Sequence, residues 1–543
     1  MKESGIFIFV LFVIITECPN RSKTPYQGLP DDFIHAKADV VVADTISYHP
    51  VHADQNGNIL PWFSSNPGES YDHVIKLVWQ FWNNMETCPN GLKYYINHMI
   101  WRSGHDHTTG IGGDQFMMAL SSWDLLYNYT GDEAVLKDMK YIADYYLEHS
   151  LSSADCEWPF LPYPNNLNRH SGEYNGDMML GEGYLQVDKA GSFGFELVKL
   201  YKKTGDKKYL SAAINIANTL ATKVHPGDDN NSPWPFKVNA KTGEIGGSTK
   251  HKINKSTYTT FWTSTIGLFT GLIGLKEGNT SAYKNALDIT VGWLRNYPSK
   301  TNKWGPFFED ISGWSDTQIN AITYAMFIIE HPELDPNWKE TVTNIFKWVH
   351  TELGNKENIK YGVICTNEQT VYRVPGNSHS SRQASVELMY WEKTGDTTYA
   401  RNSIRQLNWA TYMVDVDGKN RYPFPDARIW LTDGYGDYIR HYLRAMAAAP
   451  QLAPDNSDHL LRSSSIVKKI TYQPSEINYS VFNNGSLEKF RLTAKPKTIK
   501  VDGKTLKETS DINSNGWIWQ SLKKGGVLTI KHTVGNNIAV LGN

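Results

Sequence analysis

The sequence predicts a mainly α protein, an (α/α)6 toroid of six helical hairpins followed by a small C-terminal antiparallel β-sandwich. Three observations carry this prediction. A Thr-Gly-Asp turn recurs at residues 130–132, 204–206 and 394–396, each time between two apolar stretches of helical period. Gly just past one helix and Asp before the next are the stop and start signals of a helical hairpin. After about residue 463 the helical pattern gives way to short β-rich segments.

The hairpins can be counted, and the count indicates a closed ring. First helices are predicted to begin near Asp114, Ala190, Phe261, Asp316, Ser380 and Tyr435. Partner helices are predicted at residues 134–149, 209–221, 283–294, 338–352 and 399–413. The helix at residues 71–85 lacks a partner and can pair with the last first helix. An open stack of helix pairs is the alternative. Closure is favoured because the terminal pieces complement each other and the repeats vary in length.

The C-terminal segment reads as β-structure. Short β-rich stretches at residues 466–473, 490–494, 498–501, 517–519 and 526–534 are separated by Asn-Gly, Asp-Gly and Gly-Gly turns. Two roles fit a sandwich of this size. It is either a carbohydrate-binding module or a lid that seals one flank of the helical ring, and the small size favours the lid.

The remaining organisation follows from the N-terminus and from the cysteines. The apolar run at residues 5–15 is too short to cross a bilayer and is typical of a secretory signal. Cys18 follows it and is a candidate lipoprotein cysteine. We therefore expect a signal at residues 1–18, an N-terminal extension at 19–69, a catalytic ring at 70–460 and a β-sandwich at 461–543. These features predict an exported bacterial protein, periplasmic or on the outer surface.

Composition excludes some functions and favours others. The balance of 54 basic and 56 acidic residues gives no indication of a nucleic-acid partner. Cys88, Cys156 and Cys365 form neither a disulfide framework nor a metal motif, and no cofactor is expected. Eighteen Trp and 30 Tyr are many, and a good part of them falls in predicted loops. Aromatic rings can stack on sugars, although some of these simply pack the core.

The two ends of the predicted ring differ. Tight Thr-Gly-Asp turns close one end, whereas long segments precede the inner helices at residues 150–189, 223–260, 296–315, 353–379 and 414–434. Loops this long in a compact domain are usually functional. The site is therefore expected where the inner helices begin, near their free N–H groups.

Asp114 and Asp188 stand at the same distance before Thr130 and Thr204. Asp316, His379 and Asp433 hold corresponding places in other repeats. Equivalent positions of a closed ring converge on its axis, so these side chains are expected to surround one pocket. The alternative for each aspartate is an N-cap, worth about 1 kcal/mol. Aromatic and Gly neighbours, rather than a solvated helix face, favour a site.

Asp114 and Asp188 each precede a Thr-Gly-Asp turn by the same number of residues. This layout resembles that of unsaturated glucuronyl hydrolases, which are members of the six-hairpin glycosidase superfamily. The resemblance covers residues 70–455. The resemblance implies that Asp114 and Asp188 form the catalytic pair, one protonating and the other positioning substrate and water. Gln115 and Phe116 replace the usual residues after the first aspartate, the loops are longer, and a β-domain is added. Asp316 is a third candidate and could replace Asp188. Carboxyls about 6.5–9.5 Å apart would give inversion.

Cations near the same mouth suggest an acidic sugar, because Arg recognises a carboxylate through a bidentate fork. The candidate substrate-binding residues are His379, Arg382, Arg373, Asn377, Tyr372, Trp304, Tyr174 and Asp433. The predicted function is a glycoside hydrolase for uronic-acid-containing oligo- or polysaccharides. A polysaccharide lyase with a Tyr or His base would use Tyr372, His379, Asn377 or Tyr174 and is the alternative. A non-catalytic glycan-binding protein is a third possibility.

Overall fold

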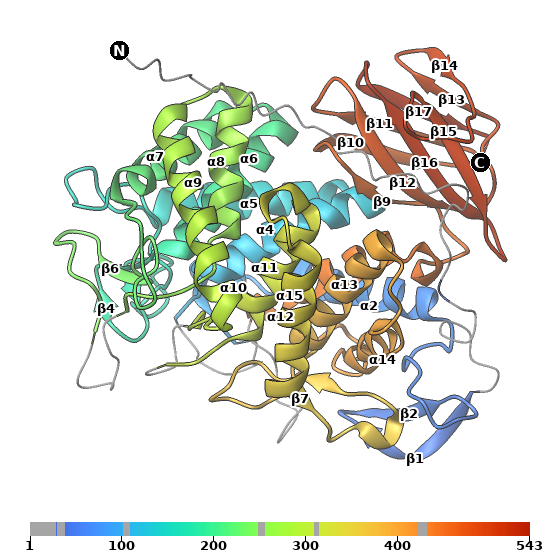
Figure 1. Ribbon diagram of the computed structural model, residues 1–543, viewed down its shortest axis with the longest axis horizontal. Helices are drawn as coiled ribbons and strands as arrows, with labels where there is room; N and C mark the ends of the chain where they lie inside the picture. The colour runs from blue at the N-terminus through green and yellow to red at the C-terminus, as the bar shows by residue number, and fades with distance from the viewer. Residues whose placement is uncertain are drawn as a thin grey trace.

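The computed structural model describes residues 29, 39–100, 109–247, 256–308, 314–421 and 432–542, with only the backbone described for Thr432 and Asp433. The expected signal at residues 1–18, including Cys18, lies outside the described residues, so export stays a prediction. Helices form one body and a β-sandwich lies beside it (Figure 1).

Six inner helices form a closed ring. They are α4 (Gly113–Thr130), α6 (Val187–Thr204), α8 (Thr263–Leu275), α11 (Gln318–Glu330), α13 (Asn377–Thr394) and α15 (Thr432–Ala448). Each contacts the next in this order, and α15 returns to contact α4. Gly436 makes the closing contact possible, because a Cβ there would lie 2.7 Å from the Ala119 backbone nitrogen. The open stack is therefore excluded, and the (α/α)6 prediction is confirmed.

Six outer helices pair with the inner ones. They are α2 (Pro67–Asn83), α5 (Glu133–His149), α7 (Lys207–Lys223), α9 (Thr280–Asn296), α12 (Trp338–Glu352) and α14 (Ala400–Thr411). Helices α5, α7, α9, α12 and α14 each follow their inner partner in the chain and contact it. Helix α2 comes first in sequence but packs against α15, as expected for the unpaired front helix.

The recurring Thr-Gly-Asp turn has the same hydrogen bonds in each copy. The Thr130 hydroxyl donates to the Leu126 carbonyl and accepts from the Asp132 backbone N–H. Gly131 adopts a left-handed conformation with φ of 69°, which favours glycine. Asp132 then caps α5 by accepting from the Ala134 N–H at 2.9 Å. The same bonds recur around Thr204 and Thr394. Three inner helices therefore end at an equivalent point.

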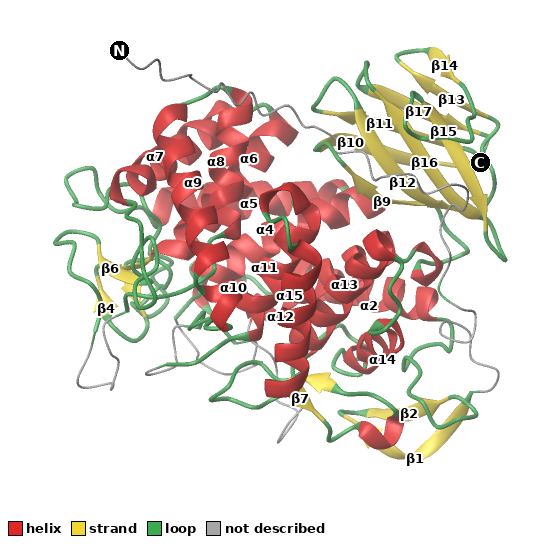
Figure 2. Cartoon of the chain, viewed as in Figure 1, coloured by secondary structure: helices red, strands yellow, loops and turns green. Residues whose placement is uncertain are grey.

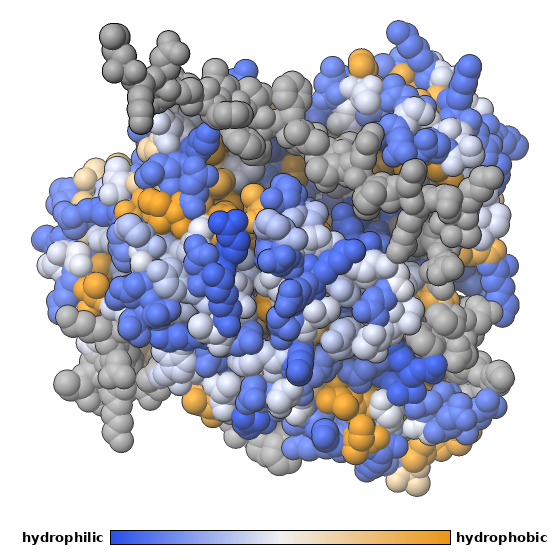
Figure 3. Space-filling view, viewed as in Figure 1, coloured by the Kyte–Doolittle hydropathy of each residue, from blue (hydrophilic) through white to orange (hydrophobic). Residues whose placement is uncertain are grey.

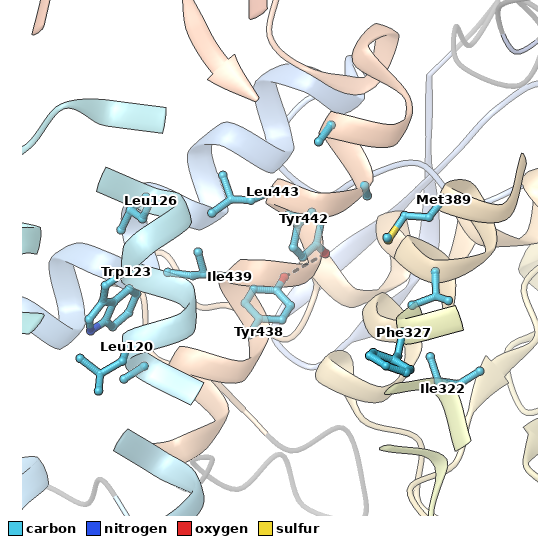
Figure 4. Packing of buried hydrophobic residues seen from close by; sticks show 14 of the residues in the cluster. Leu120, Trp123, Leu126, Ile322, Phe327, Met389, Tyr438, Ile439, Tyr442 and Leu443 are labelled. Carbon is cyan, nitrogen blue, oxygen red and sulfur yellow. Dashed lines mark hydrogen bonds between the residues drawn. The ribbon is translucent and has the colours of Figure 1, made fainter. Parts of the chain in front are cut away.

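The core fills the space between inner helices. Figure 4 shows side chains of α4 and α15 meeting on one side and those of α11 and α13 on the other. Trp123 of α4 and Ile439 of α15 are fully buried, and the Tyr438 hydroxyl donates to that of Tyr442 at 3.0 Å. Burying one large apolar side chain stabilises a fold by about 1.5–3 kcal/mol. The ring is thus held by its inner layer.

The β-sandwich has two antiparallel sheets (Figure 2). One has the order β10-β11-β17-β13-β14, and its strands are β10 (Val467–Gln473), β11 (Glu476–Val481), β17 (Asn537–Leu541), β13 (Thr498–Val501) and β14 (Lys504–Leu506). The other has the order β15-β16-β12-β9, with β15 (Gly516–Ser521), β16 (Gly526–His532), β12 (Ser486–Leu492) and β9 (His459–Ser463). Strands β9, β11, β14 and β17 were not expected from the sequence.

The β-sandwich packs against the end of the ring that carries the Thr-Gly-Asp turns. His459 of β9 stacks on the Tyr129 ring with centroids 3.7 Å apart. Lys203 donates to the Val467 carbonyl at 2.6 Å, and the Tyr472 hydroxyl donates to the Asn128 carbonyl at 2.6 Å. The sandwich therefore covers this end of the ring.

Short elements occupy the loops at the other end and the N-terminal side. They are β1 (Val40–Ile46), β2 (His49–Ala53), α3 (Tyr94–Asn97), β3 (Gly176–Asp177), β4 (Gly181–Glu182), β5 (Tyr184–Gln186), β6 (Lys237–Asn239), α10 (Pro298–Thr301), η1 (Pro332–Leu334), β7 (Gly354–Asn355), η2 (Ile359–Tyr361), β8 (Cys365–Thr366) and η3 (Pro450–Leu452). Strands β4 and β6 lie on the side of the helical body away from the sandwich (Figure 1). The face seen in Figure 3 is mostly hydrophilic. Within the described ranges, no helix is long and apolar enough to cross a membrane.

Candidate active site

Asp114 lies in the first turn of α4, at the end of the ring away from the β-sandwich. Two glycines bring this turn close to its neighbours. A Cβ on Gly112 would lie 2.5 Å from the Tyr146 ring, and one on Gly113 would lie 2.9 Å from Pro164 Cβ. The Asp114 side chain is only 2% exposed, and its Oδ1 accepts from the Gln115 N–H at 3.0 Å.

Asp188 occupies the matching position of the neighbouring helix α6 and is fully buried. Lys189 Nζ lies 2.9 Å from Asp188 Oδ2 and donates to the Phe307 carbonyl at 2.7 Å. The other carboxylate oxygen, Oδ1, has no hydrogen-bond partner among the described residues. An unsatisfied buried carboxylate oxygen is costly, and it is available to a polar group that enters the site.

The electrostatics of the two aspartates are linked. Burial raises the pKa of Asp114, and the nearby Asp188 charge raises it further, while Lys189 lowers it. Burial also raises the pKa of Asp188, against the opposing effect of Lys189. Because Lys189 forms its ion pair with Asp188, negative charge is best accommodated there. Asp114 lacks this ion pair, so we expect it to be the carboxyl that holds a proton more readily.

Aromatic side chains lie close to the Lys189 ammonium at this end of the toroid. Lys189 Nζ lies 3.5 Å from the centroid of the Phe307 ring and 5.0 Å from that of Phe236. Phe307 belongs to a small apolar cluster separate from the main core, formed by Met117, Met118, Phe261, Phe307 and Ile319. Phe308 packs against this cluster and is partly buried. The cluster places buried apolar side chains beside Lys189, with Phe308 at its edge.

A second polar group lies on the other side of Phe308. The ring centroids of Phe308 and His379 are 6.3 Å apart, and His379 Nε2 lies 4.0 Å from Glu368 Oε2. Burial, helped by the Arg382 charge, lowers the pKa of His379 to about 3. His379 is therefore a neutral imidazole near neutral pH. Lys189, which pairs with Asp188, is thus connected to His379 through the neighbouring rings of Phe307 and Phe308.

Arg382 lies deeper in the ring than a substrate-binding role requires. Its guanidinium donates to Gln318 Oε1 at 2.6 Å and to Asp437. Asp437 also accepts from Arg440 and contacts His441 Nε2 at 3.1 Å. The two arginines and His441 hold the pKa of Asp437 well below its usual range, despite burial. Arg382 therefore belongs to a buried ion network between α13 and α15.

Asp316 has its carboxylate occupied by its own loop. Oδ1 accepts from the backbone N–H groups of Trp304 and Gly305 at 2.7 and 2.9 Å. Oδ2 accepts from the Trp314 indole at 2.9 Å. These bonds hold the loop that carries Phe307 and Phe308, and they assign Asp316 a structural position. Its catalytic role stays a prediction.

The other predicted binding residues do not converge on the pair in the same way. The Tyr174 hydroxyl donates to the Ile96 carbonyl at 2.8 Å, and Asn377 donates to Asn420. Trp304 is fully buried.

Two further predicted binding residues lie at the surface. Arg373 is exposed and donates to the Glu352 carbonyl at 2.7 Å, and the Tyr372 side chain is 39% exposed. The side chain of Asp433, another predicted binding residue, lies outside the described residues.

Lys189, Phe307 and Phe308 belong to the site but were not predicted from the sequence. Lys189 directly follows Asp188, so an aspartate–lysine pair at the start of an inner helix was the available signal. The Phe307–Phe308 pair stands in a long mouth loop. Only the folding of this loop brings the Phe307 carbonyl and the Phe307 ring close to Lys189.

Comparison with solved structures identifies the architecture. A cellobiose 2-epimerase from Spirochaeta thermophila is similar with a TM-score of 0.53 and 12% identity, over 71% of this chain and 96% of that one. A second cellobiose 2-epimerase, from Bacillus thermoamylovorans, has a TM-score of 0.53 and 16% identity, over 70% of this chain and 98% of that one. A D-mannose isomerase has a TM-score of 0.52 and 8% identity, over 69% of this chain and 97% of that one. The chain therefore shares the (α/α)6 fold of these structures. No protein-family model matches it, and neither does a curated protein.

Proposed function

We propose that this protein is a carbohydrate-active enzyme, specifically a glycoside hydrolase for oligo- or polysaccharides that contain uronic acids. One observation carries the proposal: two buried carboxyls, Asp114 and Asp188, lie in equivalent first turns of adjacent inner helices, and a single lysine pairs with only one of them. The fold shared with sugar epimerases and a sugar isomerase supports a sugar as the substrate class. Phe308, which is partly buried at the edge of the apolar cluster, could offer its ring to the C–H face of a sugar.

The chemistry follows from the different surroundings of the two carboxyls. Asp114, kept protonated, donates its proton to the glycosidic oxygen as the bond to the anomeric carbon breaks. Asp188, kept charged by Lys189, accepts a proton from the attacking water, whose oxygen bonds to the anomeric carbon. Inversion is the expected outcome if the separation leaves room for that water.

The uronic-acid preference needs a test that does not depend on Arg382. Arg382 is already held by Gln318 and Asp437, so it is poorly placed to offer a bidentate fork to substrate. Loss of activity in an Arg382→Ala variant would therefore reflect damage to the ion network as well as to binding. A comparison of acidic and matched neutral substrates on the unmodified enzyme is the cleaner test.

The lyase alternative is less well supported by the geometry. Elimination needs a base for the proton next to the uronate carboxyl. His379 is neutral and lies near Phe308, which favours this role, but a pKa of about 3 makes it a weak base. The ideal catalytic base has a pKa near the working pH. Hydrolysis by the carboxyl pair is therefore preferred.

The deciding experiment is product analysis on a panel of uronate-containing oligosaccharides and their neutral counterparts. We expect new reducing ends without the ultraviolet absorbance of a new C=C bond. Asp114→Asn and Asp188→Asn should abolish this activity. Absorbance from a C=C bond would establish a lyase instead. If the wild type turns over no substrate, and Asp114→Asn and Asp188→Asn bind sugar as tightly as the wild type does, the protein would be a glycan-binding protein.

A further inference from the structure

A cavity of about 260 Å³ lies between the helical ring and the β-sandwich, at the opposite end of the ring from the carboxyl pair. Helices α4, α6 and α15 form one wall, and β9 with the segment that follows it forms the other. At about 30 Å³ per water molecule, this volume is far larger than a single hydration site. It is slightly smaller than the pockets that hold drug-sized ligands.

The charges around this cavity do not balance. Four charged side chains line it: Asp124, Lys199, Lys202 and Arg462. Asp124 pairs with Lys203 at 3.0 Å, and Lys199 pairs with Glu196 at 2.7 Å. Arg462 forms a two-pronged pair with Glu392 at 3.0 and 2.7 Å. Only Lys202 forms no ion pair with any residue of the described chain, so the surplus charge is positive.

Lys202 is also only partly exposed to solvent. Burial lowers its pKa, and the neighbouring Lys199 lowers it further, with no carboxylate acting in the opposite direction. Its ammonium lies 5.8 Å from the centroid of the Phe482 ring. A half-buried cation without an ion-pair partner is less well solvated than a fully exposed one, and an anion that enters the cavity would relieve this.

We propose that the cavity is a second ligand site, which binds a monosaccharide-sized anion through the Lys202 ammonium. A sugar acid is the occupant that the lining favours. Phe195 offers an aromatic face, and the amides of Asn128 and Asn483 offer hydrogen-bonding groups at the wall. Because both domains line the site, its ligand would also hold the β-sandwich against the ring.

Isothermal titration of the full-length protein with sodium glucuronate, glucose and sodium sulfate at constant ionic strength tests this proposal. Glucuronate should bind saturably and glucose much more weakly. Lys202→Met should weaken glucuronate binding by at least about tenfold, as expected for loss of a charged hydrogen bond. Lys202→Arg should retain it. Glucuronate should raise the melting temperature of the wild type and not that of Lys202→Met.

A control variant separates this site from the rest of the molecule. Lys207→Met removes an exposed lysine on the following helix. It should bind glucuronate as the wild type does. Unchanged binding in Lys202→Met, or equal binding of glucose, would overturn the proposal. Sulfate binding as tight as that of glucuronate would overturn the assignment to a sugar acid.

Discussion

Lys189 and Asp188 are consecutive residues at the start of α6, and their side chains form an ion pair with Nζ 2.9 Å from Oδ2. Both are almost completely excluded from solvent. A buried ion pair contributes little net stability, because desolvation offsets the attraction, yet breaking one by removing a partner is costly. Its effect at this position is electrostatic, since the Lys189 charge opposes the rise that burial causes in the pKa of both Asp188 and Asp114.

Replacement of Lys189 by Met should therefore affect both stability and pH dependence. The isolated Asp188 charge should cost about 3–5 kcal/mol in free energy of unfolding. Because Lys189 lowers the pKa of Asp114 and Asp188, its loss should raise both values and move the acid limb of kcat/KM to higher pH. Denaturant unfolding and a pH–rate profile measure these effects.

A double variant separates stability from catalysis. Lys189→Met combined with Asp188→Asn removes both charges, so most of the lost stability should return while activity stays low. Recovery of activity in the double variant would show that Asp188 is dispensable.

The carboxyl pair should be essential for turnover. Asp114→Asn and Asp188→Asn each remove one proton-transfer group, and each should lower kcat by about 10²–10⁴-fold. Substrate affinity, measured by equilibrium binding, should change far less. Asp288→Asn, an exposed aspartate on α9, is the matched control and should behave as the wild type. If either pair variant kept more than about a tenth of wild-type kcat, the assignment of that residue would be wrong.

Asp316 should act through its loop. Asp316→Ala leaves the N–H groups of Trp304 and Gly305 and the Trp314 indole without their acceptor. We expect a loss of about 1–3 kcal/mol in free energy of unfolding. KM should rise, because the loop positions Phe307 and Phe308, while kcat should change little. Asp316→Asn keeps an acceptor oxygen and should restore much of the stability. A large fall in kcat in both variants would instead support the catalytic role considered from the sequence.

Much of the fold could be predicted because local signals and the global topology agree. The Thr-Gly-Asp turns fix where three inner helices end. Because α4 and α6 have the same length, Asp114 and Asp188 lie in matching first turns. What surrounds these residues depends on loops, and nothing local in Phe307 indicates that its carbonyl will meet Lys189. Strand β11 could have been predicted from the sequence, because the apolar residues Ile477, Tyr479 and Val481 alternate with polar ones, as in a half-buried strand.

Two glycines of the recurring turn offer a matched test of how the β-sandwich contacts the ring. Gly205→Ala should cost about 1–2 kcal/mol, because φ is 78° and nothing lies within 4 Å of the added Cβ. Gly131→Ala carries the same backbone cost and also places its Cβ 3.2 Å from the Ile470 carbonyl oxygen. Its free energy of unfolding should fall further, by about 1 kcal/mol or more. Equal losses would indicate that the β-sandwich shifts freely at this contact.

His459 should make the contact between ring and sandwich sensitive to acid. Its Nδ1 contacts the Tyr129 carbonyl at 2.7 Å and its Nε2 contacts the Ser457 hydroxyl at 2.8 Å, an arrangement that suits a neutral imidazole. Burial lowers the pKa of His459 to about 4.

The unfolded chain binds this proton near pH 6.5, whereas the folded protein resists it until about pH 4. The stabilising contribution is therefore complete above pH 6.5 and is lost as the pH falls through that window, by about 3 kcal/mol in total. Urea unfolding at pH 7, 5.5 and 4.5 should show a shallower pH dependence for His459→Gln than for the wild type. His331→Gln alters an exposed histidine at a hairpin turn and should leave the slope unchanged. A wild-type slope in His459→Gln would mean that other groups cause the acid sensitivity.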